Sequence, residues 1–116
     1  MLRALLPGAG SRLAVYGTLA PGEANHHLLA ACRGVFASGF VRGTRAVREF
    51  PVFTPDPNAP LVAVRWLASV DLWTLWPALD AFEGEDYRRV LVPVLGPGSE
   101  LVTVANLYAA VVPVRG

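Results

Sequence analysis

Residues 13–19 have the sequence LAVYGTL, a short apolar run that ends at a glycine. A run of this kind bounded by a turn residue predicts a buried strand over Leu13–Tyr16. The loop that follows contains Gly17 and Gly22. A glycine directly after a buried strand lets the chain turn sharply and expose consecutive backbone N–H groups. These donors could bind a carboxylate or an oxyanion, or the segment could be an ordinary connection from a strand to a helix.

The rest of the chain alternates between helix and strand patterns, and ten prolines and eleven glycines separate the segments. In the first half of the chain, the patterns predict a helix over 26–32 with Asn25 as its N-cap, a strand over 35–47 interrupted by Gly39 and Gly43, and a stiff proline-rich loop around Phe53 to Asn58. In the second half, they predict a strand over 61–67 and a helix from Leu72 to Phe82, with Ser69 as a cap candidate and Gly84 at its end. Two strands over 87–95 and 101–109, joined by a turn, complete the predicted elements.

Pro77 lies inside the second predicted helix. Because proline lacks a backbone N–H, we expect a kink or two short helices there. The order strand, helix, strands, helix, strands predicts an α+β fold with a mostly antiparallel or mixed sheet. A length of 116 residues is typical of one domain, which we place over 1–116 with tails at 1–11 and 110–116.

Composition and charge exclude several classes of function. The net charge of +1 gives no electrostatic reason to expect binding to nucleic acid or to an anionic membrane surface. The chain contains no lysine, which excludes a lysine Schiff base and a Walker P-loop. Cys32 is the only cysteine, so we expect no disulfide within the chain and no site with several cysteine ligands. His26 and His27 are adjacent and would point in different directions on a helix, so we expect no metal site there either. No apolar run reaches about 18 residues, so we expect no transmembrane helix and a cytoplasmic location with reduced thiols.

The stretch 79–89, LDAFEGEDYRR, contains four of the nine acidic residues. Asp80 and Glu83 are three residues apart and share one face of the predicted helix with apolar neighbours. A carboxylate on the apolar side is desolvated, which raises its pKa and makes it a usable proton shuttle near neutral pH. Alternatively, the cluster is a solvated helix end at which Glu85 and Asp86 pair loosely with the two arginines.

The two stretches together resemble a known family. Residues 15–19 (VYGTL), followed by Gly22 and by the pair Asn25-His26, resemble the opening motif of the γ-glutamylcyclotransferase superfamily, in its γ-glutamylamine cyclotransferase and AIG2-like branch. Residues 79–84 (LDAFEG), followed by Tyr87 and Arg89, are similar to the second motif of that family. The resemblance extends over about 13–108, and the two motifs in this order are specific although each alone is modest.

The resemblance implies a small mixed, mostly antiparallel β-barrel with two main flanking helices. It implies an enzyme that cyclises the γ-glutamyl group of a γ-glutamyl amine or amide and releases 5-oxoproline and a free amine, without cofactor or metal. It assigns the role of general acid/base to Glu83. The residues assigned to substrate binding are Tyr16, Gly17, Thr18, Leu19, Tyr87 and Tyr108.

The chemistry of these residue types agrees with that assignment. The attacking α-amino group is largely protonated near neutral pH, so a carboxylate must take its proton and later return one to the leaving amine. We therefore expect Glu83 in a concavity beside residues 16–19, partly buried and with a raised pKa. Asp80 is expected to stabilise its own helix or a neighbouring backbone, and Glu85 and Asp86 are expected to be exposed.

Two residues depart from the family pattern. Arg65 stands where family members often carry an acid, which favours an altered substrate, and Pro77 is unusual in the second helix.

Two alternatives therefore stay open. One is a non-catalytic domain that holds a small amine or carboxylate in the same pocket, and the other is an enzyme that uses Glu83 for a different intramolecular acyl transfer, such as removal of a γ-glutamyl protecting group. The leaving amine, the pathway and the oligomeric state are not predicted.

Overall fold

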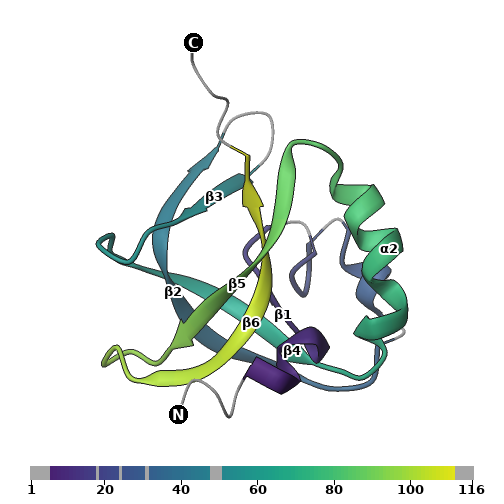
Figure 1. Ribbon diagram of the computed structural model, residues 1–116, viewed down its shortest axis with the longest axis horizontal. Coiled ribbons are helices and arrows are strands. Elements are labelled where there is room, and N and C mark those ends of the chain that lie inside the picture. Colours follow the sequence, from purple (N-terminus) through teal and green to yellow (C-terminus); the bar gives the residue numbers. More distant parts are fainter. Residues whose placement is uncertain (1–5, 18, 24, 31, 48–50, 112–116) are drawn as a thin grey trace.

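The computed structural model describes residues 6–17, 19–23, 25–30, 32–47 and 51–111 (Figure 1). Its elements, in chain order, are the 3-10 segment η1 (Leu6–Ser11), strand β1 (Arg12–Val15), the 3-10 segment η2 (His26–Leu29), strands β2 (Phe36–Val47), β3 (Pro51–Pro55) and β4 (Leu61–Ala68), helix α2 (Leu72–Glu83), and strands β5 (Tyr87–Leu95) and β6 (Leu101–Ala110). Among these residues, no helix has the length and apolar character needed to cross a bilayer.

The strands form a mixed barrel. Their order is β3-β2-β4-β1-β6-β5, and a pairing of Phe40 with Leu95 between β2 and β5 closes the sheet on itself. The pairing of β1 with β6 is parallel, and the other pairings are antiparallel. Strand β3 extends the sheet outside the closed barrel, and α2 lies along one side (Figure 1). The predicted small α+β barrel is therefore confirmed.

Apolar side chains fill the barrel. On β4, Val62, Val64 and Trp66 face this interior, as their alternation predicted. The buried residues of this interior are Ala14, Val41, Phe53, Val64, Val92, Val94, Ala105, Leu107 and Ala109.

The proline-rich segment is not the loop that we predicted. Pro51–Pro55 is strand β3, and Phe53 at its centre is completely buried. Proline is compatible with a strand at the edge of a sheet, where its missing N–H removes no ladder bond, and β3 is such an edge. The Phe53 ring packs directly over Gly43, where a β-carbon would approach it to 2.3 Å. Gly43 therefore makes room for a core side chain and does not interrupt β2.

A second apolar cluster joins the barrel to α2. Leu13 and Val15 on the outer face of β1 pack against one face of the helix. That face carries Leu72, Trp76 and Leu79 at helical spacing. This packing brings the C-terminal end of β1 and the C-terminal end of α2 to the same side of the molecule.

The start of α2 agrees with the predicted cap in part. Asp71 is the N-cap residue, but its side chain makes no capping bond. The Ser69 hydroxyl instead accepts a hydrogen bond from the Asp71 N–H at 3.2 Å, and the Ser69 carbonyl accepts one from the Leu72 N–H. Ser69 thus supports the turn that precedes the helix.

The expected break at Pro77 does not occur, because α2 is one helix over Leu72–Glu83. A proline removes the hydrogen bond to the carbonyl four residues earlier, which here belongs to Trp73. Both Pro77 and Trp73 are exposed, so water can satisfy that carbonyl. The missing bond therefore lies on the solvent side of the helix, where it is tolerated.

The first predicted helix and the N-terminal tail also differ from expectation. The described residues within 26–32 form no α-helix: His26–Leu29 is a 3-10 segment, and the Asn25 side chain makes no capping bond. One α-helix, not two, therefore flanks the barrel in the described residues. Leu6–Ser11, predicted as part of a tail, forms η1, in which Ala9 is buried and its carbonyl accepts a 2.9 Å hydrogen bond from Asn106 Nδ2.

Candidate active site

A cavity of about 280 Å³ lies where β1, α2, β5 and β6 meet. It joins the two stretches that the sequence singled out, because its walls come from the loop after β1 and from the end of α2. The predicted site residues that line it are Tyr16, Gly17, Leu19, Glu83, Tyr87 and Tyr108. Thr18, the remaining predicted residue of this set, lies outside the described residues.

Glu83 is the last residue of α2, and its side chain is largely withdrawn from solvent. Leu79, four residues earlier on the same helix face, is buried in the cluster between barrel and helix, which draws Glu83 toward the interior. Burial raises the pKa of Glu83 from 4.5 to about 7. A carboxyl group with this pKa is ready both to accept and to donate a proton near neutral pH.

The chain leaves the helix immediately after Glu83. Gly84 has φ of +74° and ψ of −166°, a backbone conformation that residues with a β-carbon rarely adopt. Its N–H donates to the Asp80 carbonyl at 3.0 Å and ends the helix. Gly84 thereby directs the chain toward Tyr87, the first residue of β5, so that Glu83 and Tyr87 line the same cavity.

Tyr16 and Tyr108 contribute rings whose hydroxyl groups are bonded within the protein. The Tyr16 hydroxyl donates to the main-chain carbonyl of Tyr108 at 2.6 Å, and its ring lies 5.3 Å from the ring of Phe53. The Tyr108 hydroxyl donates to Asp80 Oδ1 at 2.6 Å. Burial is the largest cause that raises the pKa of both tyrosines, and the nearby charge of Glu83 raises each of them further.

The loop after β1 is held in place from two sides. A turn closes it, because the Ala20 N–H donates to the Gly17 carbonyl at 3.0 Å. The Leu19 side chain is buried, and its carbonyl lies 3.0 Å from His26 Nδ1, so that nitrogen must carry the proton and donate it. His26 is therefore a structural support for the loop. The described residues contain no group of three or more His, Cys, Asp or Glu placed to hold a metal ion.

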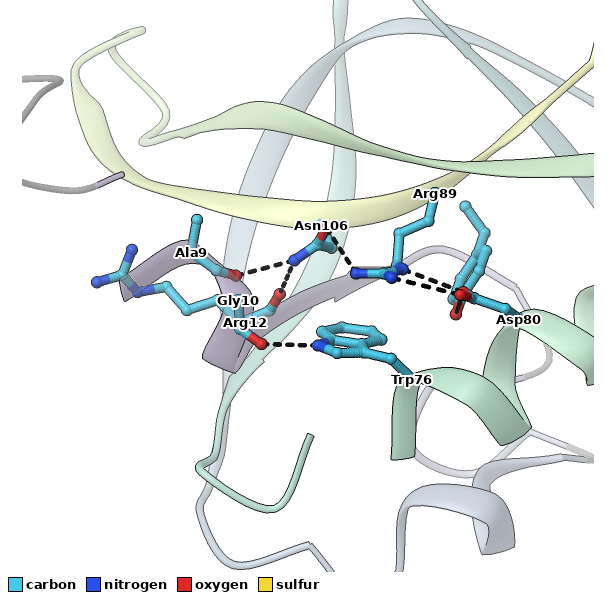
Figure 2. Close-up of polar contacts among 8 residues, drawn as sticks. Ala9, Gly10, Arg12, Trp76, Asp80, Arg89 and Asn106 are labelled. Atoms are coloured by element: carbon cyan, nitrogen blue, oxygen red, sulfur yellow. Dashed lines mark hydrogen bonds and ion pairs between the residues drawn. The ribbon is translucent and has the colours of Figure 1, made fainter. Parts of the chain in front are cut away.

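Asp80 is expected to stabilise its own helix or a neighbouring backbone, and the hydrogen bonds that its carboxylate accepts come from side chains. Its carboxylate accepts a hydrogen bond from the Tyr108 hydroxyl. It also accepts two from Arg89, with Nε at 3.0 Å and Nη2 at 3.3 Å (Figure 2). Burial raises the pKa of Asp80, but the bonds from Tyr108 and Arg89 outweigh it and hold the pKa below its usual value. Asp80 therefore stays ionised, which disfavours it as a proton shuttle.

Arg89 extends this network across the molecule. Its guanidinium lies 4.3 Å from the centre of the Trp76 ring and bonds to Asn106 Oδ1 at 3.5 Å (Figure 2). Asn106 Nδ2 in turn donates to the carbonyls of Ala9 and Arg12. The network fixes α2 against β5, β6 and the N-terminal segment, and so fixes the end of the helix that carries Glu83.

Some of the remaining residues lie where the sequence predicted, and others do not. Glu85 and Asp86 are exposed, as predicted, although Asp86 also lines the cavity. Asn25 lines the cavity instead of capping a helix. Arg65, which departs from the family pattern, is exposed on β4 and is not among the described residues that line the cavity. Its charge therefore does not replace an acid inside this pocket.

Solved structures with the same fold come from several organisms. The protein PH0828 from Pyrococcus horikoshii is 20% identical with a TM-score of 0.63, over 90% of this chain and 81% of that chain. An AIG2-like protein from Mus musculus is 19% identical with a TM-score of 0.63, over 90% and 79%. YkqA from Bacillus subtilis is 25% identical with a TM-score of 0.69, over 86% of this chain and 35% of YkqA, so this chain spans about a third of that protein.

No curated protein matched the chain. The family described as gamma-glutamyl cyclotransferase, AIG2-like, matches residues 13–114, which is most of the sequence and includes both motifs and the whole cavity. The barrel, the cavity and this match agree, and the chain belongs to the AIG2-like γ-glutamyl cyclotransferase family.

Proposed function

We propose that this protein is a γ-glutamyl cyclotransferase that releases 5-oxoproline and a free amine from a γ-glutamyl amine or amide. The observation that carries the proposal is the placement of Glu83. Its carboxyl group, with a pKa of about 7, lines a cavity that Gly17 and Leu19 also line. The site thus combines a proton shuttle with backbone next to which a carboxylate or an oxyanion can bind.

Glu83 performs the proton transfers in this proposal. The α-ammonium group of the substrate loses one proton to the ionised carboxylate, and the neutral nitrogen attacks the γ-carbonyl carbon to form the ring C–N bond. As the bond to the leaving nitrogen breaks, protonated Glu83 donates to that nitrogen. Two of the three ammonium protons thereby reach the leaving amine, which departs as an ammonium ion, and the third stays on the lactam nitrogen. One carboxyl group with a pKa near neutrality can relay both protons in succession.

The loop after β1 binds the negative charges in this proposal. The α-carboxylate of the substrate and the oxyanion that forms on the γ-carbonyl oxygen both need N–H donors. Backbone N–H groups of Gly17 and Leu19 supply them, and the hydrogen bond from the Ala20 N–H to the Gly17 carbonyl closes a turn there in advance of binding. Holding the substrate curled toward a five-membered ring supplies a further part of the rate.

Other ionisable groups near the cavity are less suited to this role. Asp80 is held ionised by Arg89 and Tyr108, so it does not return a proton. Tyr16 and Tyr108 have raised pKa values, chiefly because of burial, and their hydroxyl protons are already given to protein acceptors. This comparison supports Glu83 as the shuttle.

A panel of γ-glutamyl amines and γ-glutamyl dipeptides tests the proposal through the appearance of 5-oxoproline. The proposal predicts release from at least one γ-glutamyl amine without added metal or cofactor. A protein that binds members of the panel but releases no 5-oxoproline from any of them would be a binding domain instead. An enzyme that releases the free amine from γ-glutamyl substrates without forming 5-oxoproline would support a different acyl transfer.

A further inference from the structure

The direction of the hydroxyl proton of Tyr108 can be assigned. Tyr108 Oη and Asp80 Oδ1 are 2.6 Å apart, so one proton lies between them. Asp80 also accepts two hydrogen bonds from Arg89, at 3.0 and 3.3 Å, and a carboxylate in such a pair is ionised. An ionised carboxylate can only accept, so Tyr108 must donate its single proton to Asp80.

The direction of this proton determines whether the Tyr108 hydroxyl can donate a hydrogen bond to a ligand or only accept one. A phenol has one proton and two acceptor positions, and here the proton is used outside the cavity. Tyr108 lines the cavity together with Glu83, and the Glu83 charge is close enough to act on the Tyr108 hydroxyl. To a ligand that reaches it, the oxygen of Tyr108 therefore presents acceptor capacity and no proton.

Tyr16 differs in this respect. Its hydroxyl donates to the Tyr108 carbonyl, and it also receives a hydrogen bond from the backbone of Phe53. Both its proton and an acceptor position are thus occupied by the protein. Tyr16 supports the wall of the cavity with one of its two acceptor positions occupied, whereas no contact among the described residues occupies an acceptor position of the Tyr108 hydroxyl.

We propose that Tyr108 Oη and the Glu83 carboxylate together form the subsite for the α-amino group of the substrate, and that Asp80 is a positioning residue that acts through Tyr108. This inference rests on the proposed function. An ammonium group carries three N–H donors and no acceptor, so a pair of acceptor oxygens is complementary to it. A hydroxyl group free to rotate could instead turn its proton toward the ammonium group, and Asp80 prevents this.

The arrangement also separates two tasks in the reaction. Glu83 removes a proton from the ammonium nitrogen, while Tyr108 keeps a hydrogen bond from a second N–H of the same nitrogen. The nitrogen is thereby held in place while its lone pair forms the bond to the γ-carbonyl carbon. Tyr108 loses and gains no proton, because its own proton stays with Asp80.

Two ligands that differ only in the α-amino group test this subsite. L-Glutamate and glutarate share both carboxylates, so the ratio of their dissociation constants, measured by calorimetry at neutral pH, isolates the contribution of the amino group. The wild type should favour glutamate. In Tyr108→Phe we expect this preference to fall by about tenfold, the value of one hydrogen bond to a charged group, while glutarate binding stays within about twofold.

Asp80→Asn tests the positioning role separately. The Asn side-chain amide can donate to Tyr108 Oη, which would release the hydroxyl proton toward the cavity. We expect the preference for glutamate to fall at least as far as in Tyr108→Phe, although the Tyr108 hydroxyl is still present. A purely structural role for Asp80 would instead weaken the binding of both ligands to the same extent. Thermal melting checks that each variant is folded, and if one of them does not fold, the other still tests the subsite.

An unchanged preference for glutamate in a folded Tyr108→Phe variant would overturn the inference, and so would an equal loss of affinity for both ligands. The release of 5-oxoproline by the wild type is measured independently. If release occurs and the preference is unchanged, only the subsite is wrong. If no γ-glutamyl amine is cyclised, the proposed function fails, and the calorimetric comparison still decides whether the pair of acceptors recognises an amino group.

Discussion

The hydroxyl of Tyr16 donates a 2.6 Å hydrogen bond to the main-chain carbonyl of Tyr108, which joins the residue after the first strand to the last strand. The two strands are the parallel pair of the barrel, β1 and β6. Both tyrosines also line the cavity. This bond therefore ties the wall of the candidate active site to the closure of the barrel.

Tyr16→Phe tests the strength of that connection. The substitution keeps the ring and its contact with Phe53 but removes the donor to the Tyr108 carbonyl. We expect the free energy of unfolding to fall by about 1–2 kcal/mol, the usual effect of deleting one partner of a partly buried hydrogen bond. Urea denaturation measures this as a lower midpoint with an unchanged slope. A midpoint equal to that of the wild type would mean that the bond adds no stability.

The raised pKa of Glu83 predicts how stability depends on pH. Burial raises this pKa from 4.5 in the unfolded chain to about 7, so the folded state favours the protonated form. The contribution of Glu83 to stability is therefore fully present below about pH 4.5 and is lost as the pH rises through about 7. Glu83→Gln stays neutral and should become more stable than the wild type at alkaline pH, by on the order of 1–3 kcal/mol.

Urea denaturation at acidic and at alkaline pH measures this difference. Glu85→Gln is the matched control, because it replaces the same carboxyl group by the same amide two residues away, at an exposed position. The control should show no comparable pH-dependent gain. If Glu83→Gln and the wild type differed equally at both pH values, the carboxyl group would not have a raised pKa in the folded state.

Gly84→Ala tests the turn that follows Glu83. The backbone of Gly84 lies in a region almost restricted to glycine, and a β-carbon there would meet no atom within 4 Å. The expected loss of about 1–3 kcal/mol is therefore conformational strain and not a steric clash. Relief of that strain would shift the end of α2, so we also expect slower turnover. A variant with wild-type stability and turnover would show that the turn does not position Glu83.

The fold could be predicted from local patterns and from two motifs. Apolar alternation identified most strands, and the helical spacing of Leu72 and Leu79 identified α2. The strand around Phe53 was missed because its prolines indicate a loop in isolation. They are acceptable only because β3 is an edge strand, which depends on how distant segments pair.

The site could be predicted in part for a similar reason. The motifs brought Glu83 and residues 16–19 to attention, and the structure places the described members of this set around one cavity. The partners of Asp80 could not be predicted, because Tyr108 lies 28 residues away in the chain and reaches Asp80 only when β6 packs against α2. A local charge pattern indicates which groups are present, but long-range packing decides which of them meet.

The comparison of Glu83→Gln with Glu85→Gln tests the central claim most directly. Both substitutions remove one carboxyl group and keep nearly the same shape, but only Glu83 lines the cavity. The substrate is a γ-glutamyl amine that the wild type cyclises. Glu83→Gln should lower the rate of 5-oxoproline release by about 10²–10⁴-fold and change the substrate affinity by only a few-fold. Glu85→Gln should match the wild type in both. Undiminished release of 5-oxoproline by Glu83→Gln would contradict the account.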